Sequence, residues 1–268
     1  MNCQGVPDSS KIINMKIQYC SDLHLESPEN NKYVERHLIE PVGDVLILAG
    51  DIMSFEMHKQ PSVFLDFIEA NFEMTYWIPG NHEFYDYDLA TVSNPLLEKV
   101  RSNIWMVNNQ VVTYNNINFI CSTLWSKINP VNALDIQRSI PDFHSIQWEG
   151  KRFTTRQFNQ LHNQSVAFLE KAFKETKGSK SIVVTHHVPT LYQYPEKYRN
   201  SPLNEAFVTE LYDTIHDSGA AYWVYGHHHS NVAEFEVGKT KMVTNQLGYV
   251  QRAEHRKFNS KVYFEFNY

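Results

Sequence analysis

From residue 15 onwards, short apolar runs alternate with segments in which apolar residues recur every three or four positions. The short runs are rich in β-branched and aromatic residues, which predicts strands. They span residues 15–20, 44–48, 74–78, 104–107, 111–114, 117–123, 181–184, 220–225, 232–237, 241–245 and 261–266. The longer period predicts helices at residues 32–39, 61–71, 88–101, 154–174 and 205–217. This alternation predicts an α/β fold.

Two segments, residues 125–151 and 192–203, interrupt the pattern with several prolines and no clean period. We interpret them as irregular excursions over one end of the sheet. The chain shows no repeat, low-complexity run or linker, so we expect a single domain over residues 15–268. Residues 1–14 form a polar arm without the apolar core of a secretory signal.

Composition narrows the classes of partner. The formal net charge of −6 over 268 residues argues against a nucleic-acid or membrane surface across the chain, although a local basic patch stays open. The three cysteines, Cys3, Cys20 and Cys121, have no CxxC spacing, which favours a reducing compartment and hence the cytoplasm. No apolar run is long enough to span a membrane.

The strand at 220–225 leads directly into three consecutive histidines, His227, His228 and His229. Burying several imidazoles side by side costs desolvation energy unless they have partners. Neutral imidazole is the commonest side-chain metal ligand. The run therefore indicates either a metal site or an exposed histidine turn.

Polar residues with the same capacity follow the other buried strands. In layered α/β folds, functional groups gather at the carboxyl ends of the central strands. Two carboxylates, one amide and four imidazoles, with no thiolate, suit divalent first-row metals and are enough for two ions. These seven donors are Asp22, His24, Asp51, Asn81, His186, His227 and His229. Taken singly, Asp22 or Asp51 could instead cap a helix.

Five blocks in this order resemble the calcineurin-like metallophosphoesterase superfamily, over about residues 15–229. They are Asp22-Leu23-His24, Gly50-Asp51-Ile52, Gly80-Asn81-His82-Glu83, Thr185-His186-His187 and Gly226-His227-His228-His229. The resemblance implies a four-layer α-β-β-α sandwich, in which two mixed sheets are flanked by helices and a two-metal centre lies at the sheet edge.

The resemblance also implies a role for each residue. Asp22, His24 and His229 would bind one metal, Asn81, His186 and His227 the other, and Asp51 would bridge the two. His82 would lie beside the scissile phosphate rather than on a metal.

Two cations held close together by one bridging carboxylate lower the pKa of a water that bridges them, and they hold the phosphoryl oxygens. We therefore expect a bridging hydroxide to attack phosphorus, while protonated His82 stabilises the transition state or protonates the leaving oxygen. Manganese, iron, zinc or cobalt fits the donor set. The expected substrate is a small-molecule phosphodiester or phosphomonoester.

The stretch Gly50-Asp51-Ile52-Met53-Ser54-Phe55 departs from the Gly-Asp-x-Val-Asp-Arg-Gly pattern of the serine/threonine protein phosphatases. The missing Asp and Arg argue against protein dephosphorylation and leave His82 without that branch's orienting partner. The block Asp22-Leu23-His24-Leu25-Glu26 looks more like the bacterial-type phosphodiesterase and small phosphohydrolase branch.

For the residues beside the motifs, we expect structural, supporting or surface roles rather than metal binding or catalysis. We expect Glu83 to be a structural carboxylate, His187 and His228 to support ligands or face solvent, and His144 to be an exposed loop residue. The other histidines, His37, His58, His162, His216 and His255, are expected at the surface. Aromatic residues that either stack on a substrate ring or fasten loops are Tyr85, Tyr87, Trp125, Tyr192, Tyr194 and Tyr198. Arg138, Arg152 and Arg199 are candidates for binding a second phosphate.

Two other function classes remain beside the hydrolase. A scaffold that keeps the fold without catalysis is disfavoured by the complete ligand set and His82. A nuclease is disfavoured by the acidic charge balance, because nucleic-acid affinity depends largely on cationic side chains. The sequence leaves the natural substrate, the metal and the oligomeric state open.

Overall fold

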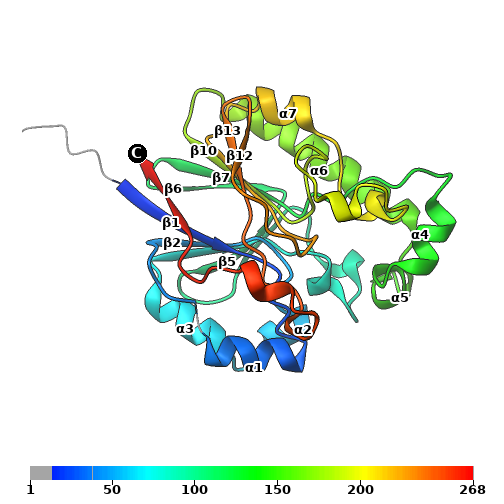
Figure 1. The fold of residues 1–268 in the computed structure, drawn as a ribbon, viewed down its shortest axis with the longest axis horizontal. Coiled ribbons are helices and arrows are strands. Elements are labelled where there is room, and N and C mark those ends of the chain that lie inside the picture. Colours follow the sequence, from blue (N-terminus) through cyan, green and yellow to red (C-terminus); the bar gives the residue numbers. More distant parts are fainter. Residues whose placement is uncertain (1–13, 38, 268) are drawn as a thin grey trace, which may run out of the picture.

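The computed structural model describes residues 14–37 and 39–267. Apart from Asn14, the first residue of the first strand, the expected polar arm lies outside the described residues. Two large sheets lie face to face with helices on their outer faces (Figure 1). The predicted four-layer α-β-β-α arrangement of two mixed sheets is confirmed. None of the helices described has the length and hydropathy needed to cross a bilayer.

The first sheet has parallel central strands and antiparallel edges. Strands β1, β2, β3 and β5 run parallel, and β14 and β4 pair antiparallel at the two edges. In spatial order the strands are β14 (Tyr263–Asn267), β1 (Asn14–Cys20), β2 (Val45–Leu48), β3 (Met74–Trp77), β5 (Ile104–Asn108) and β4 (Leu96–Lys99).

The second sheet repeats this arrangement. Strands β7, β10, β11 and β13 run parallel, and β12 and β6 are the antiparallel edges. Its order is β12 (Phe235–Val237), β13 (Thr240–Val243), β11 (Tyr222–Val224), β10 (Ser181–Thr185), β7 (Ile117–Ser122) and β6 (Gln110–Tyr114). A small separate hairpin pairs β8 (Gln147–Trp148) with β9 (Lys151–Arg152).

The helices connect and cover the strands. The α-helices are α1 (Pro28–Arg36), α2 (Phe55–His58), α3 (Val63–Asn71), α4 (Ala133–Ser139), α5 (Asp142–Ser145), α6 (Thr155–Glu175) and α7 (Tyr212–Asp217). Short 3₁₀ turns are η1 (His82–Phe84), η2 (Leu89–Thr91), η3 (Glu196–Tyr198), η4 (Asn204–Ala206), η5 (Val250–Arg252) and η6 (Glu254–Lys257). Helices α1 and α3 lie outside the first sheet, and α6 and α7 outside the second (Figure 1).

Side-chain alternation along the strands produces three hydrophobic layers. In β2, Val45 and Ile47 join the cluster between the two sheets, whereas Leu46 and Leu48 join the cluster beneath the helices of the first sheet. In the second sheet, Trp223 of β11 belongs to a third cluster on the outer face, with residues of α6. Because successive strand residues point to opposite faces, a fully apolar strand such as β2 is buried on both sides.

The predicted helix at residues 88–101 is wrong. The segment contains only the 3₁₀ turn η2, followed by the edge strand β4, of which Leu96 is buried and the rest is exposed. Pro95 explains the failure, since proline lacks an amide proton and disfavours helical geometry in the residue before it. The apolar spacing there mimicked a helix that the proline forbids.

Two further expectations need correction. The helix predicted for residues 205–217 survives only as η4 and α7, because Thr209 between them donates its amide hydrogen to the carbonyl of Val188 (3.0 Å). The segment at residues 125–151 is not irregular throughout. It contains α4, α5 and the β8–β9 hairpin, and it buries Phe143 completely.

His58 and His162 are buried, contrary to the surface location expected for them. His162 donates from Nδ1 to the carbonyl of Trp125 (2.8 Å), and His58 packs edge-on against Trp77. Their positions on helices did not reveal which helix face they occupy. His37 and His216 are exposed as expected, and so is His144.

Candidate metal centre

The carboxyl ends of β1, β2, β3, β10 and β11 bring all seven candidate donors into one neighbourhood. Donor atoms of Asp22, His24, Asp51 and His229 lie within 4.8 Å of one another, and so do those of Asp51, His186 and His227. The side-chain oxygen of Asn81 lies 3.1 Å from Nε2 of His186. Asp51 belongs to both groups, as a bridging carboxylate would. Their role as metal ligands stays a prediction.

The backbone at these strand ends is unusual. Five of the donor residues have positive φ angles: Asp22 (56°), His24 (48°), Asp51 (55°), His227 (80°) and His229 (47°). Left-handed backbone costs energy in a residue that carries a Cβ atom, and such residues cluster at functional sites. The chain therefore turns sharply as it leaves β1, β2 and β11.

Two glycines allow the strand ends to approach this closely. A Cβ atom on Gly80 would lie 2.2 Å from Oδ1 of Asp51 and 2.7 Å from Nε2 of His186. A Cβ atom on Gly226 would lie 2.7 Å from Oδ2 of Asp22. Any larger residue at these positions would displace a candidate ligand.

The first group of donors presents lone pairs to a common point. His24 donates from Nδ1 to Glu26 (2.9 Å), and His229 donates from Nδ1 to Glu254 (2.8 Å). When the rings are neutral, each hydrogen bond fixes the tautomer and leaves the lone pair on Nε2. These two Nε2 atoms lie 2.9 Å apart. Two such acceptors cannot hydrogen-bond to each other, and either a proton or a metal cation shared between them satisfies both.

The second group has the same character. His186 donates from Nδ1 to the carbonyl of Ala49 (2.9 Å), which leaves a lone pair on Nε2. That atom faces the oxygen of Asn81 and Nδ1 of His227, both at 3.1 Å. His227 directs its other nitrogen, Nε2, at the carbonyl of Ala206 (3.3 Å). When both rings are neutral, hydrogen-bond acceptor atoms therefore face one another here as well.

The buried charge is also one-sided. Asp22 and Asp51 are 0% and 1% exposed, and no Lys or Arg within the described ranges forms an ion pair with either. Burial alone lowers the pKa of His186, but the charge of Asp51 and a hydrogen bond to it raise that pKa to about 9. The pKa of His229 rises to about 10 against the same burial, because Asp22 and Glu254 contact it. Protons on these two imidazoles balance the buried carboxylates, and a divalent cation that displaced the protons would balance them in the same way.

His82 lies beside the donors, and its backbone amide donates to Oδ1 of Asp51 (2.9 Å). Its Nδ1 lies 2.9 Å from the Glu26 oxygen that also contacts His24. Burial lowers the pKa of His82, yet Asp51 and Glu26 outweigh it and raise that pKa above its usual value. Glu26 is therefore in position to orient His82, a role for which the sequence analysis named no residue. Glu26 does lie within the block Asp22-Leu23-His24-Leu25-Glu26.

Glu83 has the structural role expected of it. Its carboxylate accepts hydrogen bonds from the backbone amides of Asp51 (3.0 Å), Ile52 (2.8 Å) and Gly80 (2.6 Å), and from the indole of Trp77 (2.9 Å). One buried side chain therefore holds the loops after β2 and β3 together.

Asp142 is a neighbour of the site that sequence reasoning missed. This buried carboxylate accepts hydrogen bonds from the side-chain amide of Asn81 (2.8 Å) and the hydroxyl of Tyr85 (2.7 Å). Because the amide nitrogen of Asn81 faces Asp142, its oxygen faces His186. Asp142 comes from α5, far along the chain from any strand-exit motif, so no spacing signal could have identified it.

His187 and His228 are buried but belong to neither donor group. His187 stacks on His227, with ring centroids 4.1 Å apart, and His228 contacts the side chain of Gln246 (3.1 Å). Both support neighbours, and the solvent-facing alternative is wrong.

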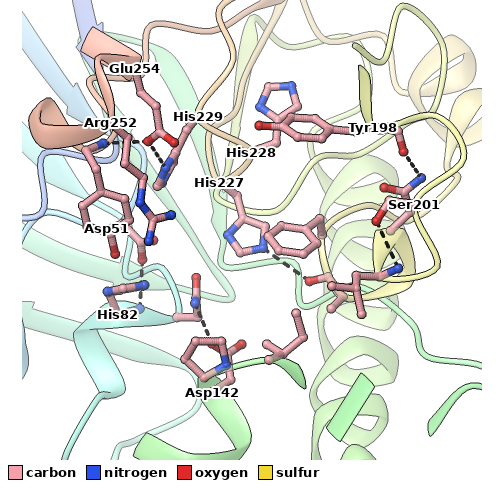
Figure 2. Close-up of a pocket in the computed structure, with 18 of the residues that line it drawn as sticks. Asp51, His82, Asp142, Tyr198, Ser201, His227, His228, His229, Arg252 and Glu254 are labelled. Atoms are coloured by element: carbon pink, nitrogen blue, oxygen red, sulfur yellow. Dashed lines mark hydrogen bonds and ion pairs between the residues drawn. The ribbon is translucent and has the colours of Figure 1, made fainter. Parts of the chain in front are cut away.

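A cavity of about 540 Å³ opens from the donors (Figure 2). Of the six aromatic residues considered from the sequence, Tyr85, Tyr194 and Tyr198 line it. Trp125 is instead buried in the core, and Tyr192 is exposed outside the cavity. The lining arginine is Arg252 of η5, not one of the three candidates proposed from the sequence.

Other proteins resemble this chain in sequence or in fold. The chain is 29% identical to an uncharacterised protein of Acanthamoeba polyphaga mimivirus, over 93% of this chain and 96% of that protein. The crystal structure of phosphopantetheinyl hydrolase from Mycobacterium tuberculosis superposes with a TM-score of 0.67 at 17% identity, over 94% and 95% of the two chains. A dimetal phosphatase from Danio rerio gives a TM-score of 0.44 at 10% identity, over 87% of each chain.

The profile of the calcineurin-like phosphoesterase family matches residues 15–231, which include all five motif blocks. The resemblance inferred from those blocks is therefore confirmed. The chain belongs to the calcineurin-like phosphoesterase family.

Proposed function

We propose that this protein is a dinuclear metal-dependent hydrolase of small-molecule phosphoesters, acting on phosphodiesters or phosphomonoesters. The observation that carries the proposal is the meeting of two groups of candidate metal ligands at the buried carboxylate of Asp51. A binding scaffold has no need of this many buried ionisable side chains at one point, because burying them costs stability.

The side chains of the site have different roles in this proposal. Asp22, His24 and His229 would hold one divalent ion; Asn81, His186 and His227 would hold the other, with Asp51 contacting both. When bound, manganese, iron, zinc or cobalt ions supply a water of lowered pKa and positive charge for the phosphoryl oxygens. Glu26 and Glu254 keep two of the imidazoles in the tautomer that binds a cation.

His82 holds and delivers a proton in this proposal. With Nδ1 tied to Glu26, the ring presents Nε2 to the substrate, and the charges of Asp51 and Glu26, which raise the pKa of His82, favour its protonated form. Protonated His82 then donates to the leaving oxygen, a contribution of about 10²–10⁴-fold.

The test uses protein stripped by a chelator and reloaded with manganese, zinc or iron. We expect two equivalents of metal per chain and metal-dependent hydrolysis of 4-nitrophenyl phosphate, bis(4-nitrophenyl) phosphate or both. No hydrolysis of either ester with any metal, despite full loading, would favour the scaffold.

His82→Ala should retain both metals and lose about 10²–10⁴-fold in turnover of an alkyl ester, whose leaving group needs a proton. His144→Ala, which removes an exposed imidazole, is the matched control and should match the parent. Undiminished alkyl-ester turnover in the His82 variant would rule out the proton-donor role.

The surroundings of the site bear on the alternatives. Among the described residues, Arg252 is the one Lys or Arg that lines the cavity, so a polyanionic strand would meet little positive charge, and a nuclease is disfavoured. Cys20 and Cys121 are buried free thiols, in keeping with the cytoplasmic location that we propose.

A further inference from the structure

The cavity is much larger than a phosphate group needs and has two unlike ends. Figure 2 shows Asp51, His82 and Arg252 on one side and Tyr198 and Ser201 on the other. A volume of about 540 Å³ is in the range of pockets that enclose whole small molecules. The space beyond the donors is therefore available to the group esterified to phosphate.

The wall at the far end comes from the two segments that interrupt the strand–helix pattern. Ile140 and Pro141 line it from the first segment, and Tyr194, Tyr198 and Leu203 from the second. Tyr194 and Ile140 are buried, at 5% and 6% exposure, so the wall is packed into the domain. Such a surface gains free energy by covering an apolar group.

Most polar atoms of that wall already form hydrogen bonds within the protein. The side-chain amide of Asn204 donates to the carbonyls of Tyr198 (2.7 Å) and Arg199 (3.2 Å), and its oxygen lies 3.4 Å from the hydroxyl of Tyr194. The hydroxyl oxygen of Ser201 accepts from the amide of Leu203 (3.2 Å). These bonds shape the loop and leave few donors to neutralise a charged ligand.

Among the lining residues, formal charge lies at the donor end, although Lys197, which does not line the cavity, lies over the ring of Tyr198 (4.4 Å). Arg252 lies over the ring of Tyr249 (4.9 Å), and Tyr249 stacks on His24, with ring centroids 4.5 Å apart. This stack holds the guanidinium near the donors, and Arg252 forms no ion pair among the described residues. The lining carboxylates Asp142 and Glu254 would repel a second anionic group.

We infer that the substrate class is a phosphoester of an uncharged, predominantly apolar alcohol, whose organic group occupies the pocket between residues 140–141 and 194–203. The inference rests on the proposed function, since it takes the phosphoryl group to lie at the donors. Arg252 binds a non-bridging phosphoryl oxygen, and the ester group lies away from it.

The test is a titration of metal-loaded protein with methyl-, ethyl-, butyl- and hexylphosphonate by calorimetry. These ligands are not hydrolysed and differ only in chain length. Apolar burial predicts that Kd falls about threefold to fourfold per methylene. A chain with a terminal carboxylate should bind more weakly than its uncharged counterpart. A Kd independent of chain length would overturn the inference.

Variants separate the two ends of the cavity. Leu203→Asp should flatten the dependence on chain length, whereas Leu191→Asp, at an exposed leucine outside the cavity, should preserve it. Arg252→Ala should weaken all four ligands by a similar factor and keep the dependence. A full dependence in Leu203→Asp would overturn the inference. If that variant does not fold, the parent series decides alone.

The two proposals can fail separately. A steep chain-length dependence without hydrolysis of any ester would leave an apolar phosphonate pocket on a protein that is not a hydrolase. Hydrolysis of nitrophenyl esters with no chain-length dependence would keep the enzyme and remove the ester-group pocket.

Discussion

The donor end and the far end of the cavity are built in opposite ways. At the donor end, acceptor atoms face one another around buried Asp51, and the carboxylates of Glu26 and Glu254 fix neighbouring imidazoles. At the far end, hydrogen bonds stay within the loop and present an apolar surface. In our proposal, this difference assigns the chemistry to the donor end and substrate selection to the far end.

The largest expected effect comes from the carboxylate shared by both donor groups. Asp51→Asn keeps the side-chain shape but removes the charge, so both ions should bind more weakly. We expect activity to fall by about three orders of magnitude, because metal ions supply several kcal/mol of transition-state stabilisation. Metal content after desalting measures the loss directly. Asp213→Asn, at an exposed site on α7, is the control; retention of two ions by the Asp51 variant would contradict the bridging role.

A smaller effect is expected from Glu26, which contacts His24 and His82 but is not itself a predicted ligand. Glu26→Gln removes the charge that holds His24 and His82, so activity should fall by about 100-fold and metal affinity by about tenfold. Glu29→Gln, an exposed change on α1, should have no effect. Calorimetric metal titration beside kinetics separates the two consequences. Unchanged values for both quantities would mean that Glu26 orients neither ring.

The smallest effect is expected from Asp142, which contacts the predicted ligand Asn81 and also lines the cavity. Asp142→Asn weakens the contact that directs the amide of Asn81, so one of the two metal affinities should fall by about tenfold while the other stays unchanged. Exposed Asp135 on α4 provides the matched substitution, Asp135→Asn. Equal weakening of both affinities would show that Asp142 acts on the whole site rather than through Asn81.

The sequence predicted the donor end far better than the cavity wall. Each candidate donor follows an apolar strand, and parallel strands bring their ends to one edge, so local patterns were enough to gather the donors there. The family resemblance then grouped Asp22 with His229. Asp142 and Arg252 follow no such rule. They reach the site through contacts between distant loops, which no local period encodes.

The errors have two origins. At residues 88–101 the helical period was followed despite Pro95, whereas around residues 205–211 the apolar spacing was read without the tertiary pairing that overrides it. Pro95 places one segment in an edge strand, and pairing with Val188 draws the other into a loop. Buried His58 and His162 show that polarity alone does not locate a side chain.

The last strand, β14, pairs with β1, and its Phe264 stacks on Tyr222 of β11, with ring centroids 3.7 Å apart. It therefore ties together the two strands that lead to Asp22 and to His227. During synthesis on the ribosome, the residues of the donor groups emerge well before β14 does. Until it docks, β1 is an unprotected sheet edge, prone to pairing with other chains. Docking of β14 therefore protects the strand that leads to Asp22 and connects the two sheets whose ends carry the donor groups.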